Sequence, residues 1–251
     1  MISKKFGLEK NNVAGKLFTF EGIEGSGKGT HVSVLKEELI NRGYPISTLK
    51  FYEPGGTDFA DLMRSILKQN ADQEFTKNHF KDLVHLFQKF KISPTTQSFL
   101  FFAARADQLE KKVKAELEKG NYVFLDRSKD STTTYQGYAQ NPKLIPWIRE
   151  TNKQIFEGAD VQITKTIYLD VSVEEGLRRS SLRDSGKKDF FDKKGKGFFE
   201  KVRNGYLSEI EYYNSLSKKD SEYSRIISIP TEAPVDEVKD RVLKALIPYL
   251  D

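Results

Sequence analysis

The chain has 251 residues, a formal net charge of +5 and no cysteine. This length suffices for one large domain or two small ones, and the 37% apolar and 12% aromatic residues exclude a disordered chain. The lack of cysteine excludes a disulfide framework and a thiolate metal site, while the positive charge suits a nucleotide, a nucleic acid or an acidic membrane surface as partner.

Short apolar runs rich in β-branched and aromatic residues predict strands at 17–21, 46–51, 122–125, 166–170 and 225–229. Helical periodicity between them predicts helices at 32–41, 103–119 and 234–249, the first two followed by a glycine that favours a helix end. Strands that alternate with helices favour parallel βαβ units. We therefore expect an α/β fold in which helices flank a parallel sheet.

Two segments interrupt this alternation. Residues 70–92 predict one amphipathic helix, which either packs on the core or presents a surface to another subunit. Residues 178–197 are rich in Arg, Lys, Gly and Asp and predict either a solvated loop or a mobile lid that closes on phosphate. No repeat or linker divides the chain, so we expect a single domain over 1–251. We also expect it to be cytoplasmic, because no apolar stretch is long enough for a membrane span or a signal peptide.

A glycine-rich segment follows the first predicted strand and precedes a predicted helix. It matches most of the phosphate-binding-loop pattern, in which backbone amides curl around a phosphate and the helix start faces the same charge. Lys28 adds a point charge for the outer phosphates and is a candidate catalytic residue. The predicted ATP-binding residues are Gly22, Glu24, Gly25, Ser26, Gly27, Lys28, Gly29 and Thr30.

Two residues of this loop are irregular. Gly29 stands where the pattern has a Ser or Thr that binds Mg²⁺, so either Thr30 takes over or phosphates and water hold the metal. Asp126, which closes the predicted strand at 122–125, is the second metal candidate. Glu24 is a carboxylate inside a phosphate site, so we expect it to point elsewhere, towards a hydroxyl of a second substrate.

Four segments in this order resemble those of the thymidylate kinases, the phosphate-loop nucleoside monophosphate kinases that phosphorylate dTMP. They are residues 20–28, Glu-Pro-Gly-Gly-Thr at 53–57, Leu-Phe-Phe-Ala-Ala-Arg at 100–105, and Asp126-Arg127 with Tyr-Gln-Gly at 135–137. The combination is similar to the bacterial branch. The resemblance implies a nucleoside monophosphate kinase-like fold with a lid, transfer of the γ-phosphoryl group of ATP to dTMP with Mg²⁺, and a homodimer.

The resemblance also implies roles for individual residues. Glu24 resembles the residue that binds the dTMP 3′-hydroxyl, and Glu53 a catalytic carboxylate near the transferred phosphate. For the remaining dTMP site it implies a phosphate clamp, a ring stacked on thymine, two base readers, and contacts to the monophosphate and sugar. Arg64 is the phosphate clamp and Phe101 the stacking ring. Arg105 and Gln136 are the base readers, and Arg127 and Thr132 contact the monophosphate and sugar.

Alternatives remain for several of these residues. Phe101 also fits a core position and Arg105 a surface helix position. In the predicted lid, Arg179 and Arg183 match the spacing of catalytic arginines, and Arg183 is the preferred candidate.

Three departures from the family pattern bear on the lid's catalytic arginine and on the catalytic rate, not on the reaction class. They are Tyr52 where an Arg is usual, Asp189-Phe190 in place of Asp-Arg, and Gly29 in place of Thr. The rival functions are a kinase of dUMP, UMP or a nucleoside, and a regulatory ATP-binding protein. The Glu53 and Tyr135–Gly137 motifs argue against a nucleic-acid partner, and no membrane partner is expected.

Overall fold

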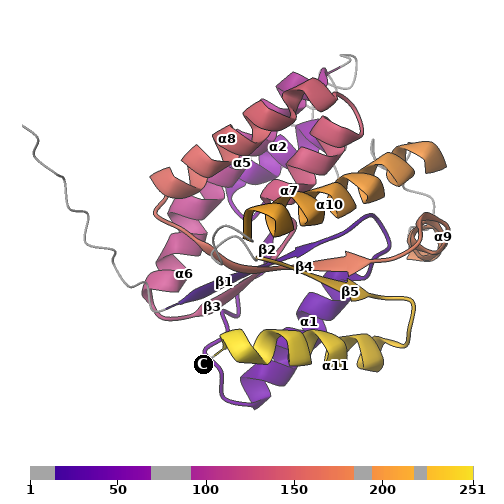
Figure 1. Ribbon diagram of the computed structural model, residues 1–251. Coiled ribbons are helices and arrows are strands. Elements are labelled where there is room, and N and C mark those ends of the chain that lie inside the picture. The colour runs from indigo at the N-terminus through magenta and orange to yellow at the C-terminus, as the bar shows by residue number, and fades with distance from the viewer. Residues whose placement is uncertain (1–14, 69–91, 184–193, 218–224, 251) are drawn as a thin grey trace, which may run out of the picture.

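The computed structural model describes residues 15–68, 92–183, 194–217 and 225–250 (Figure 1). The helix predicted at 70–92, except its last residue, lies outside these ranges. So do residues 184–193 of the predicted lid. Within the described residues, no helix combines the length and the apolar character that crossing a bilayer requires.

A five-stranded, entirely parallel sheet forms the centre of the fold, in the order β2-β3-β1-β4-β5. The strands are β1 (Lys16–Glu21), β2 (Phe51–Tyr52), β3 (Tyr122–Asp126), β4 (Ile163–Asp170) and β5 (Ile226–Pro230). The expected parallel α/β sheet is thus confirmed.

The strand predicted at 46–51 is largely wrong. Only Phe51 of that range belongs to β2, and Ile46 makes an isolated bridge to Tyr122. The intervening residues do not form a strand, because the Leu49 amide donates to Ser47 Oγ (3.3 Å) and the Ser47 hydroxyl donates in turn to Glu116.

Helices connect the strands, as predicted, but several begin earlier or were not predicted. The α-helices are α1 (Lys28–Asn41), α2 (Asp58–Lys68), α5 (Pro94–Gln108), α6 (Lys114–Glu118), α7 (Lys129–Thr132), α8 (Ile145–Gly158), α9 (Val173–Arg183), α10 (Lys196–Ser217) and α11 (Val235–Leu246). Shorter turns of π- or 3₁₀-helix are η1 (Leu109–Val113), η2 (Thr133–Tyr138), η3 (Pro142–Leu144) and η5 (Ile247–Tyr249).

The helix predicted at 103–119 is longer, since α5, η1 and α6 run on without a break from Pro94. Ser93 starts it by accepting a hydrogen bond from the amide of Thr96, with Pro94 in the first turn. The segment predicted as a loop or lid at 178–197 begins inside α9 and ends inside α10.

The two faces of the sheet are covered by different helices (Figure 1). Helices α1 and α11 lie on one face, and α5, α6, α8 and α10 lie on the other. Alternate residues of β1 contribute to the hydrophobic cores on the two faces of the sheet, because successive side chains of a strand point to opposite faces. Phe18 and Phe20 pack towards α1 and α11, whereas Leu17 packs towards η1 and α6.

This topology opens a crevice at the carboxyl ends of the central strands. From β1 the chain passes through α1 to β2 at the sheet edge, and only later returns to β3, beside β1. Open α/β sheets bind ligands where such connections diverge. The glycine-rich loop after β1 and Asp126 at the end of β3 both lie at this point.

Candidate active site

A cavity of about 380 Å³ lies at this crevice. Most residues predicted from the sequence line it: Glu24, Gly25, Gly27, Lys28, Gly29, Thr30, Glu53, Arg64, Phe101, Arg105, Asp126, Arg127 and Gln136. Four predicted residues with described side chains are not in its lining: Gly22, Ser26, Thr132 and Arg179. The lining also includes residues that were not predicted, namely Tyr52, Pro54, Leu67, Lys68, Ser128, Ser131 and Tyr135.

The glycine-rich loop turns sharply between β1 and α1. Gly25 and Gly27 have φ of +72° and +87°, in the left-handed region that side chains disfavour. Gly25 also presses against α9, where a Cβ atom would lie 1.9 Å from the carbonyl oxygen of Gly176. The start of α1 then faces the cavity with its unpaired helix amides, which is the geometry of an anion site.

Lys28, the first residue of α1, is buried beneath this loop. Its Nζ donates to the carbonyls of Gly22 (3.1 Å) and Ile23 (2.8 Å) and to Ser26 Oγ (3.3 Å). Burial, followed by repulsion from Arg127, lowers the pKa of Lys28 to about 8. The ammonium group therefore holds the loop together in this conformation and is within the cavity lining, where it can reach a phosphate.

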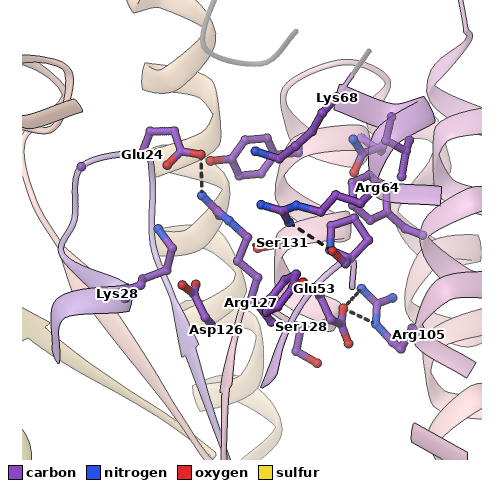
Figure 2. A pocket seen from close by; sticks show the side chains of 18 of the residues that line it. Glu24, Lys28, Glu53, Arg64, Lys68, Arg105, Asp126, Arg127, Ser128 and Ser131 are labelled. Atoms are coloured by element: carbon purple, nitrogen blue, oxygen red, sulfur yellow. Dashed lines mark hydrogen bonds and ion pairs between the residues drawn. The ribbon is translucent and has the colours of Figure 1, made fainter. Parts of the chain in front are cut away.

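Glu24 points away from Lys28 and towards Arg127 (Figure 2). Arg127 Nη2 lies 3.1 Å from Glu24 Oε1, and Nη1 donates to the Gly22 carbonyl (3.0 Å) and to Ser131 Oγ (3.3 Å). The guanidinium also lies over the Tyr135 ring, 5.2 Å from its centroid. Arg127 has a φ of +69°, so its backbone takes an uncommon conformation that aims the side chain at the loop. A carboxylate that is unhelpful to a phosphate is thereby neutralised inside the phosphate site.

Arg105 is buried, so its interpretation as a surface helix residue is wrong. Its Nε donates to Glu53 Oε2 (2.8 Å), Nη1 to Asn152 Oδ1 (2.6 Å) and Nη2 to Thr132 Oγ1 (2.9 Å). Burial raises the pKa of Glu53, against the pull of the Arg105 charge. Thr132 is thus held behind the cavity wall and acts on the cavity through Arg105.

Phe101 and Gln136 face the cavity from α5 and η2. Phe101 is half-buried and packs on the cluster around Tyr206, so it has both a core side and a cavity side. Gln136 is fully buried and its Nε2 donates to Gln97 Oε1 (3.1 Å). Its Oε1 has no hydrogen-bond partner among the described residues. A ring face and an amide edge suit a nucleobase.

Helix α2 forms another wall (Figure 2). Arg64 Nη1 donates to the Pro54 carbonyl (3.1 Å), and its guanidinium lies 5.1 Å from the centroid of the Tyr52 ring. Tyr52 is fixed in turn, because its hydroxyl donates to Asp61 Oδ1 (3.0 Å). Lys68, at the end of α2, lines the same wall.

Asp126 fits a magnesium ion, and Thr30 lines the same cavity. The Asp126 carboxylate lies beside the first turn of α1, with Oδ2 3.7 Å from where a Cβ on Gly29 would be. Its Oδ1 is buried and has no hydrogen-bond partner among the described residues. Mg²⁺ takes one or two protein oxygens and completes its shell with phosphates and water. In the described residues, no group of three His, Cys, Asp or Glu side chains gathers around a possible metal position.

The two predicted lid arginines lie at the end of α9. Arg179 Nε donates to Glu175 Oε1 (2.7 Å) and its Nη2 to the Thr231 carbonyl (3.1 Å), so in this conformation it faces the loop after β5. Arg183 is the last residue of α9, and its side chain lies outside what the structure describes.

Glu21 is a buried residue that the sequence did not single out. As the last residue of β1 it accepts hydrogen bonds from the amides of Ser128 (2.8 Å) and Ser131 (3.2 Å), from Ser131 Oγ (2.6 Å) and from the Tyr206 hydroxyl (2.9 Å). Burial raises its pKa to about 7. Glu21 therefore ties the strand before the phosphate loop to the turn that carries Arg127. The available signal was an acid that ends an apolar strand directly before the glycine-rich loop.

Comparison with known proteins agrees with this architecture. The family model for thymidylate kinase matches residues 20–87 and 76–242. The thymidylate kinase of Thermoanaerobacter sp. (strain X514) is 35% identical over 201 residues, covering 79% of this chain and 85% of that protein. That of Geotalea daltonii is 32% identical over 242 residues, covering 94% and 99%. That of Chlorobaculum parvum is 33% identical over 237 residues, covering 92% and 94%. Because the family model and these relatives each match most of its length, the chain belongs to the thymidylate kinase family.

Proposed function

We propose that this protein transfers the γ-phosphoryl group of ATP to dTMP, giving dTDP and ADP. Membership of the thymidylate kinase family makes it a kinase. The observation that carries the proposal is that one cavity joins a phosphate loop to a wall bearing an aromatic face and an amide edge. A phosphoryl donor and a nucleotide acceptor therefore fit side by side.

The donor half of the site consists of the loop and the start of α1. The loop amides and Lys28 hold the ATP phosphates, with the positive end of α1 facing them. Asp126 and Thr30 are the proposed ligands of Mg²⁺, which neutralises charge on the phosphates when bound. Arg183, and secondly Arg179, are proposed to reach the phosphates when the lid closes, where a cation stabilises the charge of the transition state.

The acceptor half consists of α2, α5, η2 and the turn after β3. Arg64 and Arg127 hold the dTMP phosphate against repulsion from ATP, because guanidinium forks suit phosphate oxygens. Phe101 stacks on thymine, while Gln136 and Arg105 contact its polar edge. Glu24 accepts a hydrogen bond from the 3′-hydroxyl group.

The reaction is a direct transfer. An oxygen of the dTMP phosphate attacks the γ-phosphorus of ATP, the bond to the β-bridging oxygen breaks, and ADP leaves. The protein contributes positioning and charge stabilisation, so no covalent enzyme intermediate is involved. Glu53, which Arg105 fixes at the cavity wall, is proposed to act near the transferred phosphate.

The test is ADP release from ATP and Mg²⁺ with dTMP, dUMP, UMP and thymidine as acceptors. We expect release with dTMP that is lost in Lys28→Met. No stimulation by dTMP at millimolar concentration contradicts the proposal. Equal stimulation by dTMP and dUMP would indicate a pyrimidine nucleotide kinase without a preference for thymine.

Two further expectations from the sequence stay proposals. The family resemblance suggests a homodimer, which light scattering at several protein concentrations tests. A cytoplasmic location is tested by cell fractionation.

A further inference from the structure

Helix α2 places two cations on one wall of the cavity. Arg64 and Lys68 are four residues apart, so their side chains share one face of the helix, and both line the cavity. We propose that Lys68 is a second phosphate-binding residue of the acceptor subsite, and that this subsite selects a dianionic nucleoside monophosphate. The inference rests on the proposed function and adds to it a residue and a charge state of the acceptor.

The charge balance of the cavity points to this role. Apart from Lys28 and Asp126, which belong to the proposed donor half, the described lining residues include four cations (Arg64, Lys68, Arg105 and Arg127) and two acids (Glu24 and Glu53), an excess of two positive charges. Both acids contact arginines, Glu24 with Arg127 and Glu53 with Arg105. The α2 wall contributes cations to the lining and no acid. An excess of two charges matches a phosphate monoester, whose second proton leaves at a pKa near 6, so that it carries close to two negative charges at neutral pH (about −1.5 to −2).

The two side chains suit different tasks. The Arg64 fork is constrained on one side by the Pro54 carbonyl and on the other by the Tyr52 ring. These two contacts fix the direction of the guanidinium. Lys68 carries a compact charge on a flexible stem, so it can follow the phosphate oxygens that Arg64 leaves exposed. In Figure 2 both side chains extend from α2 into the space that Glu24 and Arg127 face from the opposite side.

A purely structural role for Lys68 makes a different prediction. A lysine at a helix C-terminus gains modestly from the helix dipole, whatever ligand is present. Its removal then changes stability slightly and leaves nucleotide affinity unchanged. Binding measurements therefore distinguish a phosphate-binding role of Lys68 from a purely structural one.

The experiment measures the Kd of dTMP and of thymidine by calorimetry for the wild type, Lys68→Met and Lys68→Arg. Lys50→Met is the matched control, because exposed Lys50 lies near the same Tyr52 ring (5.8 Å from its centroid) but outside the cavity lining. We expect Lys68→Met to weaken dTMP about tenfold, the size of a charge-assisted hydrogen bond, and to leave thymidine unchanged. Lys68→Arg should recover part of the loss, and Lys50→Met should bind like the wild type.

The charge state is tested by pH. Between pH 7.5 and 5.5 the dTMP phosphate gains a proton, so its Kd should rise in the wild type and rise less in Lys68→Met. An unchanged Kd for dTMP in Lys68→Met, or an equal loss for dTMP and thymidine, overturns the inference. Failure of the proposed function shows differently, as wild-type protein that binds dTMP but releases no ADP with it.

Discussion

The Arg127 guanidinium lies 3.1 Å from the Glu24 carboxylate, across the entrance of the phosphate loop. The two residues come from the turns after β3 and β1, and both line the cavity. This pair lets a carboxylate stand within an anion site, because its charge is compensated locally. It also turns Glu24 away from Lys28.

Glu24→Ala should therefore weaken dTMP more than ATP. Loss of the carboxylate removes a hydrogen-bond acceptor for the sugar and the counter-charge that orients Arg127. We expect the KM for dTMP to rise about tenfold and the KM for ATP to change less than about twofold. Steady-state kinetics with each substrate varied in turn measures both. Glu24→Gln, which retains an acceptor oxygen, should fall between; a larger effect on ATP would place Glu24 on the donor side.

Arg105→Ala should destabilise the fold strongly. It leaves the buried Glu53 carboxylate without its cation, and breaking a buried ion pair costs about 3–5 kcal/mol. Urea unfolding measures the loss. Lys111→Ala is the control, since Lys111 is mostly exposed where it pairs with Asp107, and a surface pair contributes about 0–1 kcal/mol. Equal effects of the two variants would show that the buried pair does not stabilise the cavity wall.

Two glycines of the phosphate loop should differ in tolerance. Gly25→Ala forces a Cβ to 1.9 Å from the Gly176 carbonyl at a φ of +72°, so the loop must shift and ATP binding should be lost. Gly29→Ala has ordinary contact distance to Asp126 and no unusual φ, so the gain in helix propensity should stabilise the protein by about 0.5–1 kcal/mol. Thermal unfolding with and without ATP compares the two. Comparable ATP affinity in both variants would contradict this geometry.

ATP affinity should fall as the pH rises through about 8. The pKa of Lys28 is lowered to about 8, so its amine is protonated below that pH and neutral above it. Only the protonated form attracts phosphate, so binding should take up a proton around this pH. Calorimetry in buffers of different ionisation enthalpy detects that uptake. Lys28→Arg keeps its charge and should lack the alkaline loss, whereas an identical profile would assign the loss to another group.

Asp126→Asn should raise the Mg²⁺ concentration needed for half-maximal activity. The buried Oδ1 of Asp126 has no partner among the described residues, and an amide is a poorer ligand for a hard cation than a carboxylate. A Mg²⁺ titration at fixed ATP measures the shift. Asp107→Asn, which changes an acid outside the cavity lining, is the control. An unchanged Mg²⁺ midpoint in Asp126→Asn would indicate that phosphates and water alone hold the metal.

Structural features that depend on residues close together in the chain could be predicted from the sequence. The parallel α/β sheet was readable from the alternation of strands and helices, and the phosphate loop from one contiguous segment between β1 and α1. Helix α10 was missed because it begins in a stretch rich in Gly and Lys, although Phe199, Val202 and Tyr206 form one buried face further on. The strand predicted at 46–51 was wrong over most of its length because the Leu49 amide bonds to Ser47 Oγ, a contact that the apolar pattern does not reveal.

Only the tertiary structure decided how the site is assembled. Arg105 and Glu53 are 52 residues apart, and their pairing depends on α5 packing against the turn after β2. The same holds for the position of Thr132 behind Arg105, for Glu21 beneath the Arg127 turn, and for Lys68 on the cavity wall. Residue type and local spacing determine which chemistry is available, because they act along the chain. The direction of a buried charged side chain depends on its hydrogen-bond and ion-pair partners. Those partners come from distant parts of the chain, and only the fold brings them together.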